Sequence, residues 1–113
     1  MIEILRQYKF NLSTEQKLKD QMEAVFLNHN IPVMREYRFD KKNIVDYFQK
    51  GTGIAIEVKI KKNNSIDTFK QCERYAQFEE VKMIILFTNK AQGMPSSING
   101  KPVYVISAGR AWL

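Results

Sequence analysis

The most constraining feature of this sequence is an apolar run from Met83 to Phe87, inside a strand-like segment from 81 to 88. An uninterrupted run of this length is typical of a β-strand that is covered on both faces. The segment that follows Ser65 has a helical pattern, and a helix that leads into a buried strand favours a parallel crossover connection. A chain of 113 residues can bury one modest core. We therefore predict one domain over residues 1–113, with an α/β fold.

Further helices and strands are predicted from periodicity and turn residues. Ser13, with Gln16 three residues later, matches a capping box and predicts a helix from there to about Asn28. The expected buried residues of this helix are Leu18, Met22, Val25 and Phe26. Those of the helix after Ser65 are Ile66, Phe69, Cys72 and Ala76. The remaining predictions are short strands at 2–5, 33–39 and 102–106, and a loop at 89–100.

A β-hairpin is predicted around the two glycines of the segment 49–53, because glycine readily adopts the positive φ of tight turns. A turn centred on residues 51 and 52 pairs Tyr47 with Ile56, which places Asp46 opposite Glu57 with Cβ atoms roughly 5 Å apart. Carboxylates so close repel each other unless one is protonated or a cation lies between them, and hard divalent cations prefer clustered carboxylate oxygens. The hairpin therefore predicts a Mg²⁺ or Mn²⁺ site.

The second strand of this hairpin alternates strictly between apolar and polar residues from 54 to 61, apart from Ala55 on the polar face. This alternation puts Lys59 on the same face as Glu57, beside Asp46. An ammonium group next to a metal site can orient an attacking water or offset charge that develops on a phosphoryl oxygen. The three side chains are consistent with phosphodiester hydrolysis. The alternative is an edge hairpin with a solvated, charged face.

The order of three charged residues and a helix with two polar residues carries a family resemblance. Asp46, then Glu57-x-Lys59, then Gln71 and Tyr75 at i and i+4 of a helix, resembles the PD-(D/E)xK nuclease superfamily and its RecB-like branch with a QxxxY helix. The resemblance covers roughly residues 12 to 90 of the chain. It implies a restriction-endonuclease-like α/β/α sandwich with a central mixed β-sheet, and a metal-dependent DNA nuclease.

The resemblance also implies roles for individual residues. In that family the aspartate and the glutamate bind the metal, so Asp46, Glu57 and the backbone carbonyl of Val58 are expected to hold Mg²⁺ or Mn²⁺. Lys59 is expected to position or activate the attacking water. One departure is that Val45 stands where the motif name has proline.

An acid on the first helix often completes the site in this family, and Glu15 is the residue expected here. It lies three residues before Leu18 and seven before Met22, on the side of the helix that faces the sheet. The alternative for Glu15 is a solvated first-turn glutamate stabilised by the helix dipole. Glu23 and Glu36 remain rivals for the role of third acid.

Other residues are expected to act on the substrate or on the site carboxylates. Gln71 and Tyr75 can hydrogen-bond a substrate backbone or a site carboxylate, and the alternative is a helix flank whose tyrosine keeps its hydroxyl in water. Lys61, Lys62 and Arg74 are the expected nucleic-acid contacts, and for the two lysines the alternative is a solvated loop.

The composition of the chain indicates which class of molecule it binds. Lys and Arg number 18 against 12 Asp and Glu, and the net charge of +6 favours a polyanionic partner such as DNA. The single Cys72 excludes an intramolecular disulfide, and there is no His/Cys cluster for zinc. The sequence has no signal-peptide pattern and no apolar run near 18 residues, so we expect no membrane association and a cytoplasmic, intracellular location.

These features together predict a Mg²⁺- or Mn²⁺-dependent deoxyribonuclease. A single small domain has little room for sequence recognition, so we expect selectivity for DNA structure, or specificity gained from a homodimer or a partner protein. Two alternatives stay open. One is a nuclease-fold module that binds or regulates nucleic acid without cleaving it, and the other is an RNA-binding protein whose aromatic residues stack on bases.

Overall fold

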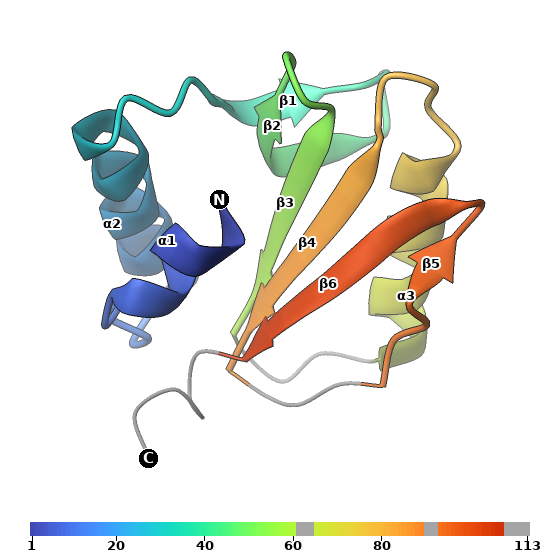
Figure 1. Ribbon diagram of the computed structural model, residues 1–113. Coiled ribbons are helices and arrows are strands. Elements are labelled where there is room, and N and C mark those ends of the chain that lie inside the picture. The colour runs from blue at the N-terminus through green and yellow to red at the C-terminus, as the bar shows by residue number, and fades with distance from the viewer. Residues whose placement is uncertain (61–64, 90–92, 108–113) are drawn as a thin grey trace.

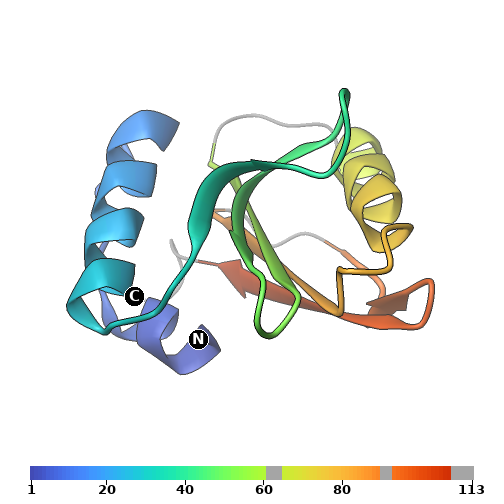
Figure 2. The same ribbon diagram turned by 90° about the horizontal axis from the view of Figure 1, so that it is seen from above.

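The protein is a mixed α/β structure built on a six-stranded sheet with the strand order β1-β2-β3-β4-β6-β5. The computed structural model describes residues 1–60, 65–89 and 93–107. Helices α1 and α2 lie on one face of the sheet and α3 lies on the other (Figures 1 and 2). The helices are α1 (Ile2–Gln7), α2 (Glu15–Asn28) and α3 (Ser65–Ala76). The strands are β1 (Met34–Arg38), β2 (Ile44–Gln49), β3 (Ile54–Lys59), β4 (Met83–Thr88), β5 (Ser97–Ile98) and β6 (Lys101–Ser107).

The hairpin of β2 and β3 has the predicted register. Tyr47 pairs with Ile56 in an antiparallel ladder that continues to the turn. Gly53 has a φ of 74°, and its amide donates to the carbonyl of Gln49 at 2.8 Å. Glycine is required there because a Cβ would lie 2.7 Å from the carbonyl oxygen of Glu80.

Strand β4 is the predicted central strand. It pairs in parallel with β3 on one side and with β6 on the other, and α3 makes the predicted crossover between β3 and β4. Its residues Ile85 and Phe87 belong to the core under α1 and α2, whereas Ile84 belongs to the core under α3. Side chains of the apolar run are therefore buried on both faces of the sheet, which is why the run contains no polar residue.

Helix α2 buries the predicted stripe of Leu18, Met22, Val25 and Phe26. Its N-cap, however, is one residue later than predicted. The hydroxyl of Thr14 accepts a hydrogen bond from the amide of Lys17 at 3.1 Å. The Ser13 hydroxyl instead donates to the side chain of Asn11 at 2.6 Å.

Three local predictions were wrong. The strand predicted at 2–5 is the helix α1, which turns Leu5 into the core. The loop predicted at 89–100 contains β5, which pairs with β6. Ile66 is 64% exposed, because α3 turns a different side to the sheet, with Thr68, Cys72, Tyr75 and Ala76 buried. Within the described ranges, no helix has both the length and the apolar character needed to cross a bilayer.

Candidate functional site

Asp46 and Glu57 meet where the regular pairing of β2 and β3 ends. The last paired residues are Tyr47 and Ile56, one position earlier. Beyond them the side chains replace the backbone ladder, since the Asp46 amide donates to Glu57 Oε1 at 3.3 Å and the Val58 amide donates to Asp46 Oδ2 at 2.7 Å. Each carboxylate is thus fixed by a main-chain amide of the other strand.

Both carboxylates are withdrawn from water. Asp46 is 7% exposed and Glu57 is 4% exposed. Burial, together with the negative charge of Asp46, raises the pKa of Glu57 to about 8, although the nearby Lys59 opposes the shift. The pair therefore favours either a proton on Glu57 or an added cation.

Helix α3 contributes two side chains that hydrogen-bond Glu57. Gln71 Nε2 lies 3.0 Å from Glu57 Oε2 and 2.9 Å from the Tyr75 hydroxyl, and can donate to either. The one hydrogen of the Tyr75 hydroxyl can be donated to the Ile44 carbonyl at 2.7 Å or to Glu57 Oε1 at 3.2 Å. Tyr75 is 1% exposed, so its hydroxyl is not in water. Of the uses expected for this helix, contact with a site carboxylate is the one that the geometry supports.

Within the part of the chain that the structure describes, two lysines face the carboxylates. Lys59 Nζ lies 3.5 Å from Glu57 Oε2, as the strand alternation predicts. Lys19 of α2, which sequence reasoning missed, places its Nζ 2.8 Å from Asp46 Oδ1 and 3.5 Å from Glu36 Oε1. Burial lowers the pKa of Lys19, but the contact with Asp46 outweighs it and the pKa is raised. No local pattern in the sequence marks Lys19, because its contact with Asp46 depends on how α2 packs against the sheet.

The three acids considered for the third position lie in different places. Glu15 is half-buried in the first turn of α2, one turn before Lys19. No hydrogen bond or ion pair among the described residues joins it to Asp46 or Glu57, so its role stays a prediction. Glu36 contacts Lys19, as stated above, and Glu23 lies 3.6 Å from the guanidinium of Arg35.

The donor set suits a hard divalent cation only in part. Carboxylate oxygens are what Mg²⁺ and Mn²⁺ prefer, and Mg²⁺ commonly binds one or two carboxylates and keeps several waters. Asp46 and Glu57 meet that requirement. Across the part of the chain that the structure describes, no three or more acidic, His or Cys side chains are grouped so as to hold a metal ion. Val58 donates its amide to Asp46, and its carbonyl as a ligand stays a prediction.

The residues expected to contact nucleic acid are only partly described. Lys61 and Lys62 lie outside the described residues. Arg74 is exposed on α3, and its Nε donates to the side chain of Asn43 at 3.2 Å. Asn43 directly precedes β2, so this contact joins Arg74 to the start of the strand that carries Asp46.

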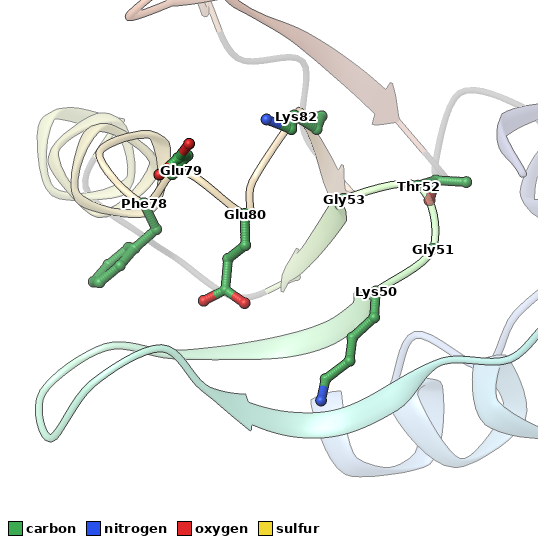
Figure 3. Close-up of a pocket in the computed structure, with 8 residues that line it drawn as sticks. All are labelled: Lys50, Gly51, Thr52, Gly53, Phe78, Glu79, Glu80 and Lys82. Carbon is green, nitrogen blue, oxygen red and sulfur yellow. The ribbon is translucent and has the colours of Figure 1, made fainter.

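A hollow of about 570 Å³ lies at the other end of β3, where the turn at 50–53 meets the segment 78–82 (Figure 3). Its charged lining is mixed, with Lys50, Glu79, Glu80 and Lys82. None of its lining residues is a predicted site residue, and β3 runs from this hollow toward Glu57 and Lys59. The candidate site is thus the carboxylate pair and not this hollow.

No protein-family model, curated protein sequence or solved structure matches this chain. Function is therefore inferred from the site geometry and from the motif resemblance.

Proposed function

We propose that this protein is a metal-dependent nuclease of the PD-(D/E)xK type that hydrolyses phosphodiester bonds in DNA. The observation that supports this most is the buried contact of Asp46 with Glu57, whose pKa is raised to about 8. Two buried carboxylates at this distance destabilise a fold unless positive charge compensates them, and one divalent ion can compensate both. The mixed sheet, in which a hairpin and a helix precede a parallel central strand, supports a restriction-endonuclease-like version of the α/β fold.

The proposed roles follow from the contacts. Asp46 and Glu57, with the Val58 carbonyl, bind Mg²⁺ or Mn²⁺. When bound, the ion supplies Lewis-acid stabilisation of the negative charge on the phosphoryl group. Lys59, whose Nζ is 3.5 Å from Glu57, orients the attacking water or offsets the developing charge.

The surrounding residues support this core. Gln71 and Tyr75 fix the orientation of the Glu57 carboxylate through the hydrogen bonds described above. Glu15, at the start of α2, is proposed as a further acid of the site. Arg74, with Lys61 and Lys62, is proposed to bind phosphates of the DNA.

DNA is the proposed partner because the chain has a net charge of +6 and phosphate contacts dominate nonspecific affinity. Phosphates are the same in every sequence, so contacts of this kind do not read bases. We therefore propose selectivity for DNA structure, such as ends, flaps or junctions, with a homodimer or a partner protein as a further source of specificity.

The experiment that tests this proposal is a cleavage assay with labelled single-stranded, duplex, flap and four-way DNA. Wild-type protein should cleave at least one of these with Mg²⁺ or Mn²⁺ and none of them with EDTA. Asp46→Asn keeps the side-chain shape and should lower the cleavage rate at least about 100-fold. Glu79→Gln, an exposed acid in the distal hollow, is the control and should cleave normally. Failure to cleave any substrate with either ion would contradict the proposal.

A second candidate is a nuclease-fold module that binds or regulates DNA without cleaving it. The observation that favours it is the 2.8 Å contact between Lys19 and Asp46, which neutralises one of the two carboxylates without a metal. Such a module should bind DNA equally well with Mg²⁺ and with EDTA, and it should leave the DNA intact.

A further inference from the structure

Among the described residues, one ammonium group faces each buried carboxylate of the site. Lys59 reaches Glu57 from the same strand, and Lys19 reaches Asp46 from α2. The Lys19 contact is the shorter, with Nζ 2.8 Å from Oδ1, and the side chain of Lys19 is only 15% exposed. The hydroxyl of Tyr47, on β2, donates to the backbone carbonyl of Lys19, so α2 is attached to β2 at this residue.

Both oxygens of Asp46 have a partner in this arrangement. Oδ2 accepts from the amide of Val58 at 2.7 Å, and Oδ1 faces Lys19. The amide is part of the sheet and cannot leave without opening it. Oδ1 has no backbone donor against it, and a divalent cation that binds Asp46 through this oxygen meets the positive charge of Lys19 at close range.

Glu36 offers Lys19 a second carboxylate. Its Oε1 lies 3.5 Å from the same Nζ, and its side chain is exposed on β1. In the β1–β2 register, Glu36 lies across from Asp46, between the pairs Arg35–Tyr47 and Tyr37–Val45. Glu36 has a φ of 54°, which is uncommon for a residue other than glycine and fits a constrained position.

We infer that Lys19 is a built-in cation that holds Asp46 in the metal-free protein and moves to Glu36 when a divalent ion binds. Lys19 is then a positioning residue for metal binding, and Glu36 is its second partner and not a metal ligand. The inference rests on the proposed metal site, and it explains how a metal-binding carboxylate can also pair with a lysine.

The test is a set of Mn²⁺ affinities measured by calorimetry on the 113-residue chain without DNA. Lys19→Gln should bind Mn²⁺ about tenfold more tightly than wild type, because no ammonium competes for Asp46. Glu36→Gln should bind about threefold more weakly, because Lys19 loses its second partner. Lys17→Gln and Glu73→Gln, exposed residues of α2 and α3, control for the change in net charge and should bind like wild type.

The double variant Lys19→Gln/Glu36→Gln separates transfer of Lys19 from simple charge effects. If Glu36 acts only through Lys19, the double variant binds Mn²⁺ as tightly as Lys19→Gln alone. Additive effects would show that each charge acts on the ion independently and would overturn the inference. Lys19→Arg keeps the cation and should retain weak, wild-type-like binding, so tighter binding in Lys19→Arg would show that the effect of Lys19→Gln comes from disturbed packing and would overturn the inference.

The outcomes distinguish this inference from the proposed function. Equal Mn²⁺ affinity in wild type and Lys19→Gln would overturn the inference while the metal site stands. If neither of them nor Lys19→Arg binds Mn²⁺, the metal site is absent, and the proposed function and the inference fail together.

Discussion

Glu57→Gln is expected to stabilise the metal-free protein at neutral pH. In the wild type, burial and the charge of Asp46 raise the pKa of Glu57 from 4.5 to about 8. An acid whose pKa is higher in the folded state makes its full contribution to the free energy of unfolding below its unfolded pKa. This contribution is lost as the pH rises through the pKa of the folded state. Glutamine has nearly the same shape and does not titrate, so the variant escapes this loss.

The size of the effect follows from the same values. Between the unfolded and folded pKa values of Glu57, each pH unit lowers the free energy of unfolding of the wild type by about 1.4 kcal/mol. The loss between pH 4.5 and pH 7 is therefore on the order of 3 kcal/mol. One amide flip of Gln71 lets its side-chain oxygen accept from the new amide at position 57, since the two groups lie 3.0 Å apart. The new glutamine therefore keeps a hydrogen-bond partner.

The assay is urea unfolding in EDTA at several pH values from 4 to 8, with Glu79→Gln as the control. The stability difference between Glu57→Gln and wild type should be close to zero near pH 4, should grow through neutral pH and should level off above about pH 8. Added Mn²⁺ should stabilise the wild type and leave the variant nearly unchanged. A difference that does not change with pH would refute the reasoning, because Glu57 would then titrate as it does in the unfolded chain.

Three further predictions concern the turn, the helix and the metal. Gly53→Ala should destabilise the protein by at least about 1–2 kcal/mol in urea unfolding, because φ is 74° and the new Cβ would meet Glu80, whereas the open Gly51→Ala should be nearly neutral. Tyr75→Phe should weaken Mn²⁺ binding about 10–100-fold in calorimetry by removing a hydroxyl that orients the site carboxylate; unchanged affinity would contradict this. Mn²⁺ affinity should rise up to about tenfold per pH unit up to about pH 8, because Glu57 must lose its proton, and a flat profile between pH 5 and 8 would contradict that.

The parts of the fold that sequence reasoning predicted are those with strong local periodicity. The apolar run of β4 indicates a strand buried on both faces, the alternation of β3 indicates a strand, and the β2–β3 register follows once the turn is fixed. The errors fall on short or weakly patterned segments. Strand β5 has two residues, although the Asn99-Gly100 pair that follows it, with φ values of 53° and 76°, is a recognisable hairpin signal.

The candidate site likewise has contacts that the sequence predicts and one that it does not. The contact of Asp46 with Glu57 follows from hairpin register, and Gln71 lies with Tyr75 because of helical spacing. Lys19 was not predictable by either rule, because it reaches Asp46 only when α2 packs across the end of β2. That contact depends on the tertiary arrangement, for which the sequence contains no local pattern.

The most direct test of the central claim, that Asp46 and Glu57 together bind a divalent ion, is an NMR titration of ¹⁵N-labelled protein with Mn²⁺. Paramagnetic broadening should appear first at the amides of residues 46, 57 and 58, and EDTA should reverse it. Broadening that begins at Glu79 and Glu80 beside the distal hollow, or no local broadening, would contradict the claim.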